Sequence, residues 1–166
     1  MNDPTCQCEA VSHSEFGPIG DREPLVRVLT NNHIRANLRL KPTAFSLKDI
    51  QTDGFSLIRW SFVDIAQFSK IADNIRFCGM AKEVVGALVA EALRLREHIN
   101  RDGSRSFCVI DDPIQGQIGV IDNPVHAIAV SSTEIDLEDA KELRDLLLDC
   151  FSRAHYINDL PYSVQT

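Results

Sequence analysis

Apolar side chains recur along the chain at two spacings, and each spacing predicts a different element. Between residues 81 and 99 they follow one another three or four positions apart, as on one face of an amphipathic helix. The same spacing predicts helices that begin after Asp64 and after Asp136, because aspartate is a good N-cap residue, and the second helix is expected to run to Arg153. A short helix is expected to begin at Pro24, since proline is well tolerated at the first helical position.

Strands are predicted where apolar and polar residues alternate, or where short apolar runs lie between turns. Residues 55–62 alternate in this way. Three further runs are separated by the turn dipeptides Asp112-Pro113 and Asn123-Pro124. They span residues 106–111, 117–121 and 125–130. Because the gaps between them are too short for a parallel crossover, antiparallel pairing is expected.

Together these elements predict the fold class. We expect an α+β domain in which a small, mostly antiparallel sheet of three to five strands packs against two long amphipathic helices. The chain has 166 residues, the usual size of a single domain, and this domain is expected to span residues 24–154. Residues 1–23 show no apolar periodicity, so an extended or disordered leader is expected there, with a C-terminal tail over residues 155–166.

Cysteine usage and hydropathy bear on the compartment. The five cysteines include no C-x-x-C pair, which argues against a zinc ribbon or a thioredoxin-like site. Cys108 and Cys150 lie in apolar runs and are expected to be small buried side chains, so a reduced, cytoplasmic compartment is favoured. No segment resembles a signal peptide or is long and apolar enough to span a membrane. Cys6, Cys8 and His13 lack the spacing of a metal site, and no metal or cofactor is predicted.

Charge limits the choice of partners. The chain carries a net charge of −7 at pH 7, and general nucleic-acid binding is disfavoured because phosphate backbones are bound through a net basic surface. Residues 24–60 nonetheless carry +4, while residues 105–166 carry −7. The basic segment therefore either forms a local basic patch or packs against the acidic C-terminal third.

His126 is the strongest single candidate for chemistry. It is expected near the start of a strand that is apolar on both faces, where a histidine can act as a general base or a metal ligand. Its acidic partners would be Asp111, Asp112 or Asp122 in the neighbouring turns. The alternative is a structural histidine whose ring nitrogens bind backbone groups of the turn at residues 122–124. The two adjacent aspartates are also candidate ligands for a divalent metal, although an acid that initiates an Asp-Pro turn explains them more simply.

Arg59 is the second candidate, because a charge in a half-apolar strand needs a carboxylate, a backbone carbonyl or a ligand. It ends the motif D-G-F-S-L-I-R at residues 53–59, and His126 lies in the motif N-P-V-H-A-I at residues 123–128. The pairing of these motifs resembles a pattern in small bacterial proteins that have no assigned activity. The resemblance implies that Arg59 and His126 belong to one site, and it implies no chemistry.

Three functions are consistent with these residues. The chain has no G-x-G-x-x-G motif, P-loop or H-E-x-x-H motif, so we expect a non-enzymatic bacterial accessory or interaction module that binds a protein partner or a second copy of itself. The first alternative is a small hydrolase or nuclease-like enzyme that uses His126 with Arg59 and a nearby aspartate. The second is a sensor in which Arg59 holds an anionic small ligand.

Overall fold

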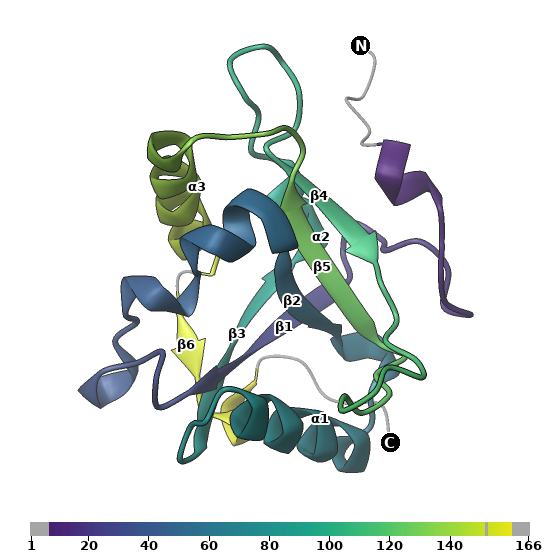
Figure 1. Ribbon diagram of the computed structural model, residues 1–166, viewed down its shortest axis with the longest axis vertical. Coiled ribbons are helices and arrows are strands. Elements are labelled where there is room, and N and C mark those ends of the chain that lie inside the picture. Colours follow the sequence, from purple (N-terminus) through teal and green to yellow (C-terminus); the bar gives the residue numbers. More distant parts are fainter. Residues whose placement is uncertain (1–6, 152, 161–166) are drawn as a thin grey trace.

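The computed structural model describes residues 7–151 and 153–160, in which six strands form one antiparallel sheet (Figure 1). The strands are β1 (Pro24–Thr30), β2 (Phe55–Arg59), β3 (Val84–Glu91), β4 (Phe107–Asp111), β5 (His126–Ser131) and β6 (Ala154–His155), in the spatial order β4-β5-β2-β1-β3-β6. The α-helices are α1 (Ile65–Cys78), α2 (Ala92–Arg96) and α3 (Leu137–Cys150). Short 3₁₀ or π turns are η1 (Gln7–Ala10), η2 (Ala36–Leu38), η3 (Pro42–Ala44), η4 (Asp49–Asp53), η5 (Trp60–Phe62) and η6 (Ile157–Asp159).

The sheet is larger than predicted, because it has six strands rather than three to five. The long helix predicted over residues 81–99 is wrong: that segment contains the eight-residue strand β3, and the only helix in it, α2, has five residues. The reason is that β3 is buried on both faces, with Leu88 in the core on one side and Ala87 in the core on the other. A strand buried on both faces is apolar at nearly every position, so it also satisfies a helical spacing.

The same ambiguity explains the error at Pro24, where a helix was expected and β1 is found. This strand lies between β2 and β3, and its two faces contribute Leu25 and Val26 to different parts of the core. The expected strand over residues 117–121 is also wrong, since that segment belongs to a loop. Gly116 and Gly119 in this loop have φ values of +63° and +78°, which belong to turns rather than to strands.

Other expectations are confirmed. The side chain of Asp64 accepts a hydrogen bond from the backbone of Gln67 at the start of α1, and Asp136 accepts one from Asp139 at the start of α3. Strands β4 and β5 pair antiparallel, and a mixed α+β fold results. Within the described residues no helix is long and apolar enough to cross a membrane.

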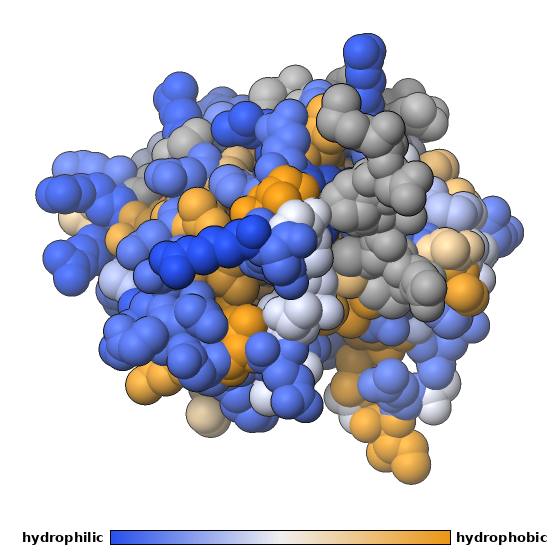
Figure 2. Space-filling view, turned by 90° about the horizontal axis from the view of Figure 1, so that it is seen from above, coloured by the Kyte–Doolittle hydropathy of each residue, from blue (hydrophilic) through white to orange (hydrophobic). Residues whose placement is uncertain are grey.

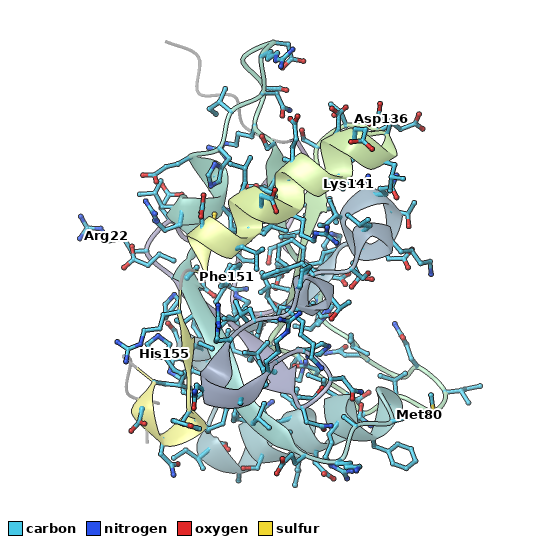
Figure 3. All side chains as sticks on the ribbon, turned by 90° about the vertical axis from the view of Figure 1, so that its left-hand side faces the viewer. Arg22, Met80, Asp136, Lys141, Phe151 and His155 are labelled. Atoms are coloured by element: carbon cyan, nitrogen blue, oxygen red, sulfur yellow. The ribbon has the colours of Figure 1, made fainter. Side chains whose placement is uncertain are left out.

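Two apolar clusters hold the helices on opposite faces of the sheet. Leu143 and Leu147 of α3 pack with Phe55 and Leu88 on one face, while Phe68 of α1 belongs to the cluster on the other face. Figure 1 shows this arrangement, with α3 and α1 on opposite sides of the strands. Figure 3 shows α3 from the side, with Asp136 at its start and Phe151 just beyond its last turn. The molecule is therefore a three-layer structure, with α1 on one face of the sheet and α3 with the short α2 on the other.

The segment before β1 lies alongside β4, as Figure 1 shows for the purple part of the chain. Several of its groups between Glu9 and Glu23 bind side chains or backbone of the sheet and of α2. We call residues 9–23 the N-terminal strap.

Candidate functional site

Arg59 lies at the end of β2, where the sheet meets the N-terminal strap. Its exposure is 0%. Nε and Nη2 donate to the two carboxylate oxygens of Glu23 at 2.6 and 2.9 Å, while Nη1 donates to Asp111 Oδ1 at 2.9 Å and to the carbonyl of Gly17 at 2.8 Å. The guanidinium is thus occupied within an internal ion cluster, and no external anion is needed to balance its charge.

Asp111 is the second acid of this cluster and fixes the strap to β4. Its Oδ2 accepts the backbone N–H groups of His13 and Ser14 at 2.9 and 2.7 Å, and it also accepts the hydroxyl of Ser12 at 3.1 Å. Burial by itself raises the pKa of Asp111, but the hydrogen bonds from Ser14, His13 and Arg59 outweigh burial and hold the pKa below its usual value. Asp111 is therefore a structural anion.

A second ion cluster holds the start of the strap. Glu9 Oε1 accepts the backbone N–H of Val109 at 2.7 Å, and Oε2 accepts from Arg96 at 2.9 Å and from Arg105 at 3.3 Å. Arg96 also binds Asp21 at 2.7 Å. The strap is thus tied to the sheet at both of its ends by buried arginines.

The cysteines differ in state. Cys108 is buried as expected, but it is disulfide-bonded. Cys78 and Cys150 are free, the first exposed and the second buried. Cys6, which the sequence places near Cys8 and His13, lies outside the described residues.

His126 lies on the opposite face of the sheet. It pairs with Ile58 across β5 and β2, and neighbouring strand residues point to opposite faces, so Arg59 and His126 point away from each other. The ring Nδ1 is 2.6 Å from the backbone carbonyl of Asp112 and 3.2 Å from its carboxylate Oδ2. The other ring nitrogen, Nε2, is buried and has no hydrogen-bond partner among the described residues.

A cavity of about 590 Å³ lies beside this histidine, between the sheet, α1 and the loop that precedes β5. We call it the His126 cavity. It is lined by Arg27, Val28, His33, Asp49, Asp53, Gly54, Ser56, Ile71, Asn74, Ile75, Cys78, Asp112, Ile114, Gln117, Val120, Ile121, Asn123, His126 and Ile128. Asn123 Oδ1 is a second buried atom without a hydrogen-bond partner, and Asn123 lines the same cavity. Buried polar groups in proteins are nearly always paired, so two unpaired ones beside one cavity make it the candidate binding site.

Two other polar groups of the cavity wall are charged or titratable. Arg27 donates to the carbonyls of Ala44 and Ser56 at 2.9 and 3.2 Å, and one of its nitrogens lies 3.9 Å from Asp49. Burial lowers the pKa of Arg27 to about 10, so it remains protonated at neutral pH. Burial also lowers the pKa of His33, and the positive charge of Arg27 adds to this effect. The wall therefore holds a neutral imidazole beside a balanced ion pair.

The structure thus divides the residues predicted from the sequence into two groups. Arg59 and Asp111 meet in the ion cluster under the strap, whereas His126 and Asp112 meet at the cavity. Asp122 joins neither group, since its carboxylate accepts the backbone N–H of Gly116 at 2.8 Å within the loop. The arrangement at His126 can do two things: accept a hydrogen bond at Nε2, or remove a proton there while Asp112 orients the ring.

Two important residues were missed by the sequence reasoning. Asn123 was considered only as part of a turn dipeptide, although an asparagine three positions before a candidate histidine is a further polar group on the same turn. Glu23 was considered only as a residue before a helix. Nothing in the local sequence of Glu23 indicates that it binds Arg59, because 36 positions separate the two.

No group of three or more potential metal-ligating side chains occurs within residues 7–151 and 153–160. Comparison with protein-family models, with curated proteins and with solved structures gave no match for this chain.

Proposed function

We propose that this domain binds a small organic molecule in the His126 cavity. The observation that supports the proposal is the pair of unpartnered buried atoms, His126 Nε2 and Asn123 Oδ1, beside one cavity of about 590 Å³. That volume lies within the range of cavities that hold small organic ligands. The lining combines seven valine and isoleucine side chains with ten polar or charged ones, so it can contact both an apolar body and a polar group of a ligand.

The free-energy cost of unpaired buried acceptors also supports ligand binding at this cavity. Leaving a buried acceptor without a donor costs about 1–3 kcal/mol, and two such acceptors lie beside this cavity. A ligand that supplies the missing donors recovers this energy on binding. The exposure of His126 is only 6% and that of Asn123 only 5%, so bulk water does not supply them.

The test is a fragment screen by thermal shift, followed by amide NMR of the hits. We expect compounds that raise the melting temperature of the wild type but not that of His126→Phe, whose larger apolar ring fills part of the cavity. His155→Phe is the matched control, because His155 lies on β6, away from the cavity wall (Figure 3). A diverse screen in which no compound binds at the cavity would refute the proposal.

A second candidate function, a protein-interaction module, is supported by an exposed apolar group near the end of α1. Phe77 is 72% exposed, and Met80, two residues beyond the end of α1, is 91% exposed. Figure 3 shows Met80 at the outer end of this region. Figure 2 gives a contrast, because the face seen from above Figure 1 is mainly hydrophilic and its apolar patches are separate. Exposed apolar groups of this kind are common at interaction surfaces.

Purification from the native host in mild salt, with mass spectrometry and light scattering, tests the second candidate. A stoichiometric companion or a dimer is expected for the wild type and should be lost in Phe77→Ser with Met80→Ser. Ile65→Ser is the control, since Ile65 is an exposed apolar residue at the other end of α1. A wild-type protein that elutes alone and monomeric would contradict this function.

The sequence favours a cytoplasmic location, but the disulfide of Cys108 argues against it, because disulfides are rare in reducing compartments. Alkylation of the protein directly in the living host decides between the two, and a free Cys108 thiol would support the cytoplasmic location. An intact disulfide under those conditions would indicate an oxidising compartment instead.

A further inference from the structure

The geometry points to the chemical class of the ligand: we propose that the His126 cavity takes a small organic cation, an amine or amidine on an apolar body. Its N–H groups would donate to His126 Nε2 and Asn123 Oδ1. This inference rests on the proposed ligand-binding function and specifies what that ligand presents.

The tautomer of His126 is fixed by its neighbour. A backbone carbonyl oxygen can only accept, and Nδ1 lies 2.6 Å from the carbonyl oxygen of Asp112. Nδ1 therefore carries the proton and donates it. In the neutral ring this leaves Nε2 with a lone pair, so the unpartnered nitrogen is an acceptor.

The second unpartnered atom is an acceptor as well. Asn123 Oδ1 is a carbonyl oxygen. The two residues belong to one turn, closed by a hydrogen bond of 3.2 Å from the backbone N–H of His126 to the carbonyl of Asn123. One short turn thus presents two acceptors, and a ligand group that satisfies both must carry at least two donors. Amines and amidines meet this requirement, whereas a carboxylate or phosphate does not.

The charges of the wall favour a positive ligand. Among the described residues, Arg27 is the only arginine or lysine of the lining, and Asp49 lies 3.9 Å from it. Asp112 has no lysine or arginine among its described contacts, and its carboxylate side chain is about half exposed. A cation near Asp112 gains its attraction, while an anion there is repelled.

The aliphatic side chains of the cavity wall favour a ligand with an apolar body. Aliphatic side chains come from β1, α1, the loop before β5 and β5 itself. They are Val28, Ile71, Ile75, Ile114, Val120, Ile121 and Ile128. A ring or short hydrocarbon group attached to the nitrogen cation buries apolar surface against them.

Binding has to move part of the wall. Each unpartnered atom exposes less than 1 Å² to water, so a donor reaches it only when a neighbouring side chain shifts. The loop between Asp112 and Asn123 supplies six lining residues and contains Gly116 and Gly119. We therefore expect amide signals of this loop to change together with those of the two acceptors.

The first experiment reads the tautomer without any ligand. Long-range ¹H–¹⁵N spectra of the uniformly labelled protein at pH 7.5 should show His126 protonated at Nδ1. A ring protonated at Nε2 would make that nitrogen a donor and would overturn the inference.

The second experiment compares benzamidine with benzoate, two planar compounds of similar size and opposite hydrogen-bonding character. In amide NMR titrations benzamidine should bind at least tenfold more tightly and shift the signals of His126, Asn123 and the loop. Equal or tighter binding of benzoate overturns the inference but leaves the proposed function standing. Likewise, fragment hits that lack N–H donors overturn only the inference, and a screen without any hit overturns the proposed function itself.

Two variants of one residue complete the test. Asn123→Leu should weaken benzamidine binding at least tenfold, whereas His155→Phe should leave it unchanged. Asn123→Asp keeps an acceptor at the same position and adds a negative charge, so it should bind benzamidine as tightly as the wild type or more tightly. If Asn123→Leu does not fold, Asn123→Asp decides, and a tenfold loss of affinity in it contradicts the inference.

Discussion

Replacing Arg59 by methionine should strongly destabilise the protein. The substitution keeps an unbranched apolar stem similar to that of arginine but removes the guanidinium. Glu23 and Asp111 are then left as buried carboxylates without their cation. Breaking a buried ion pair by removing one partner costs about 3–5 kcal/mol, and two acids depend on this arginine. We therefore expect a loss near the upper end of that range in the free energy of unfolding.

Urea denaturation followed by circular dichroism at pH 7 measures this loss. Arg76→Met is the control, since Arg76 pairs with Asp73 on the exposed side of α1 and such pairs contribute about 0–1 kcal/mol. A loss below about 1 kcal/mol for Arg59→Met would show that the ion cluster contributes little net stability, because only surface pairs are that weak.

The pH dependence gives an independent check on Arg59→Met. In the wild type the pKa of Asp111 is lowered on folding, after hydrogen bonds from Ser14, His13 and Arg59 outweigh the opposing effect of burial. Its contribution is therefore full above the unfolded pKa of about 3.9 and is lost as the pH falls through the lower folded value. Without Arg59 the folded pKa rises, so the deficit of the variant should be largest at neutral pH and shrink below about pH 4. A deficit that is independent of pH would contradict this account.

Two further outcomes follow from local geometry. Gly54→Ala places a Cβ 2.5 Å from Val130 at a φ of +74°, so we expect the free energy of unfolding, measured by urea denaturation, to fall by about 2–4 kcal/mol. Gly103→Ala is the control, because φ is +85° there and nothing lies within 4 Å of the added Cβ, and it should lose about 1–2 kcal/mol. Equal losses in the two variants would show that Val130 moves aside freely. Burial raises the pKa of Cys150 to about 11, so iodoacetamide at pH 8 should modify exposed Cys78 and spare Cys150, as read by peptide mass spectrometry, and equal labelling of both thiols would contradict the burial.

Structural features could be predicted from the sequence where a local pattern is compatible with one structure only. Aspartates at the starts of α1 and α3 cap those helices as expected, because an N-cap acts on the two or three residues beside it. The antiparallel pairing of β4 and β5 follows from the short connection between them. The need of Arg59 for a carboxylate was also recognisable, since a charge inside an apolar strand requires compensation.

The sequence could not decide what long-range packing decides. Strand β3 was mistaken for a helix because burial on both faces removes the alternation that identifies a strand. The separation of Arg59 from His126 depends on strand register: β2 and β5 place Ile58, not Arg59, opposite His126. A shift of one residue in that register would have brought the two candidates to the same face.

The N-terminal strap has a consequence for how the protein avoids self-association. Strand β4 ends the sheet on one side, and an end strand presents unpaired backbone groups that can template pairing with another chain. Glu9 occupies one of these groups by accepting the N–H of Val109, and the strap lies alongside the strand. At the opposite edge of the sheet, β6 has only two residues, so it presents few backbone groups to a strand of another chain. A truncated chain without the strap would therefore expose the backbone groups of β4 to intermolecular strand addition.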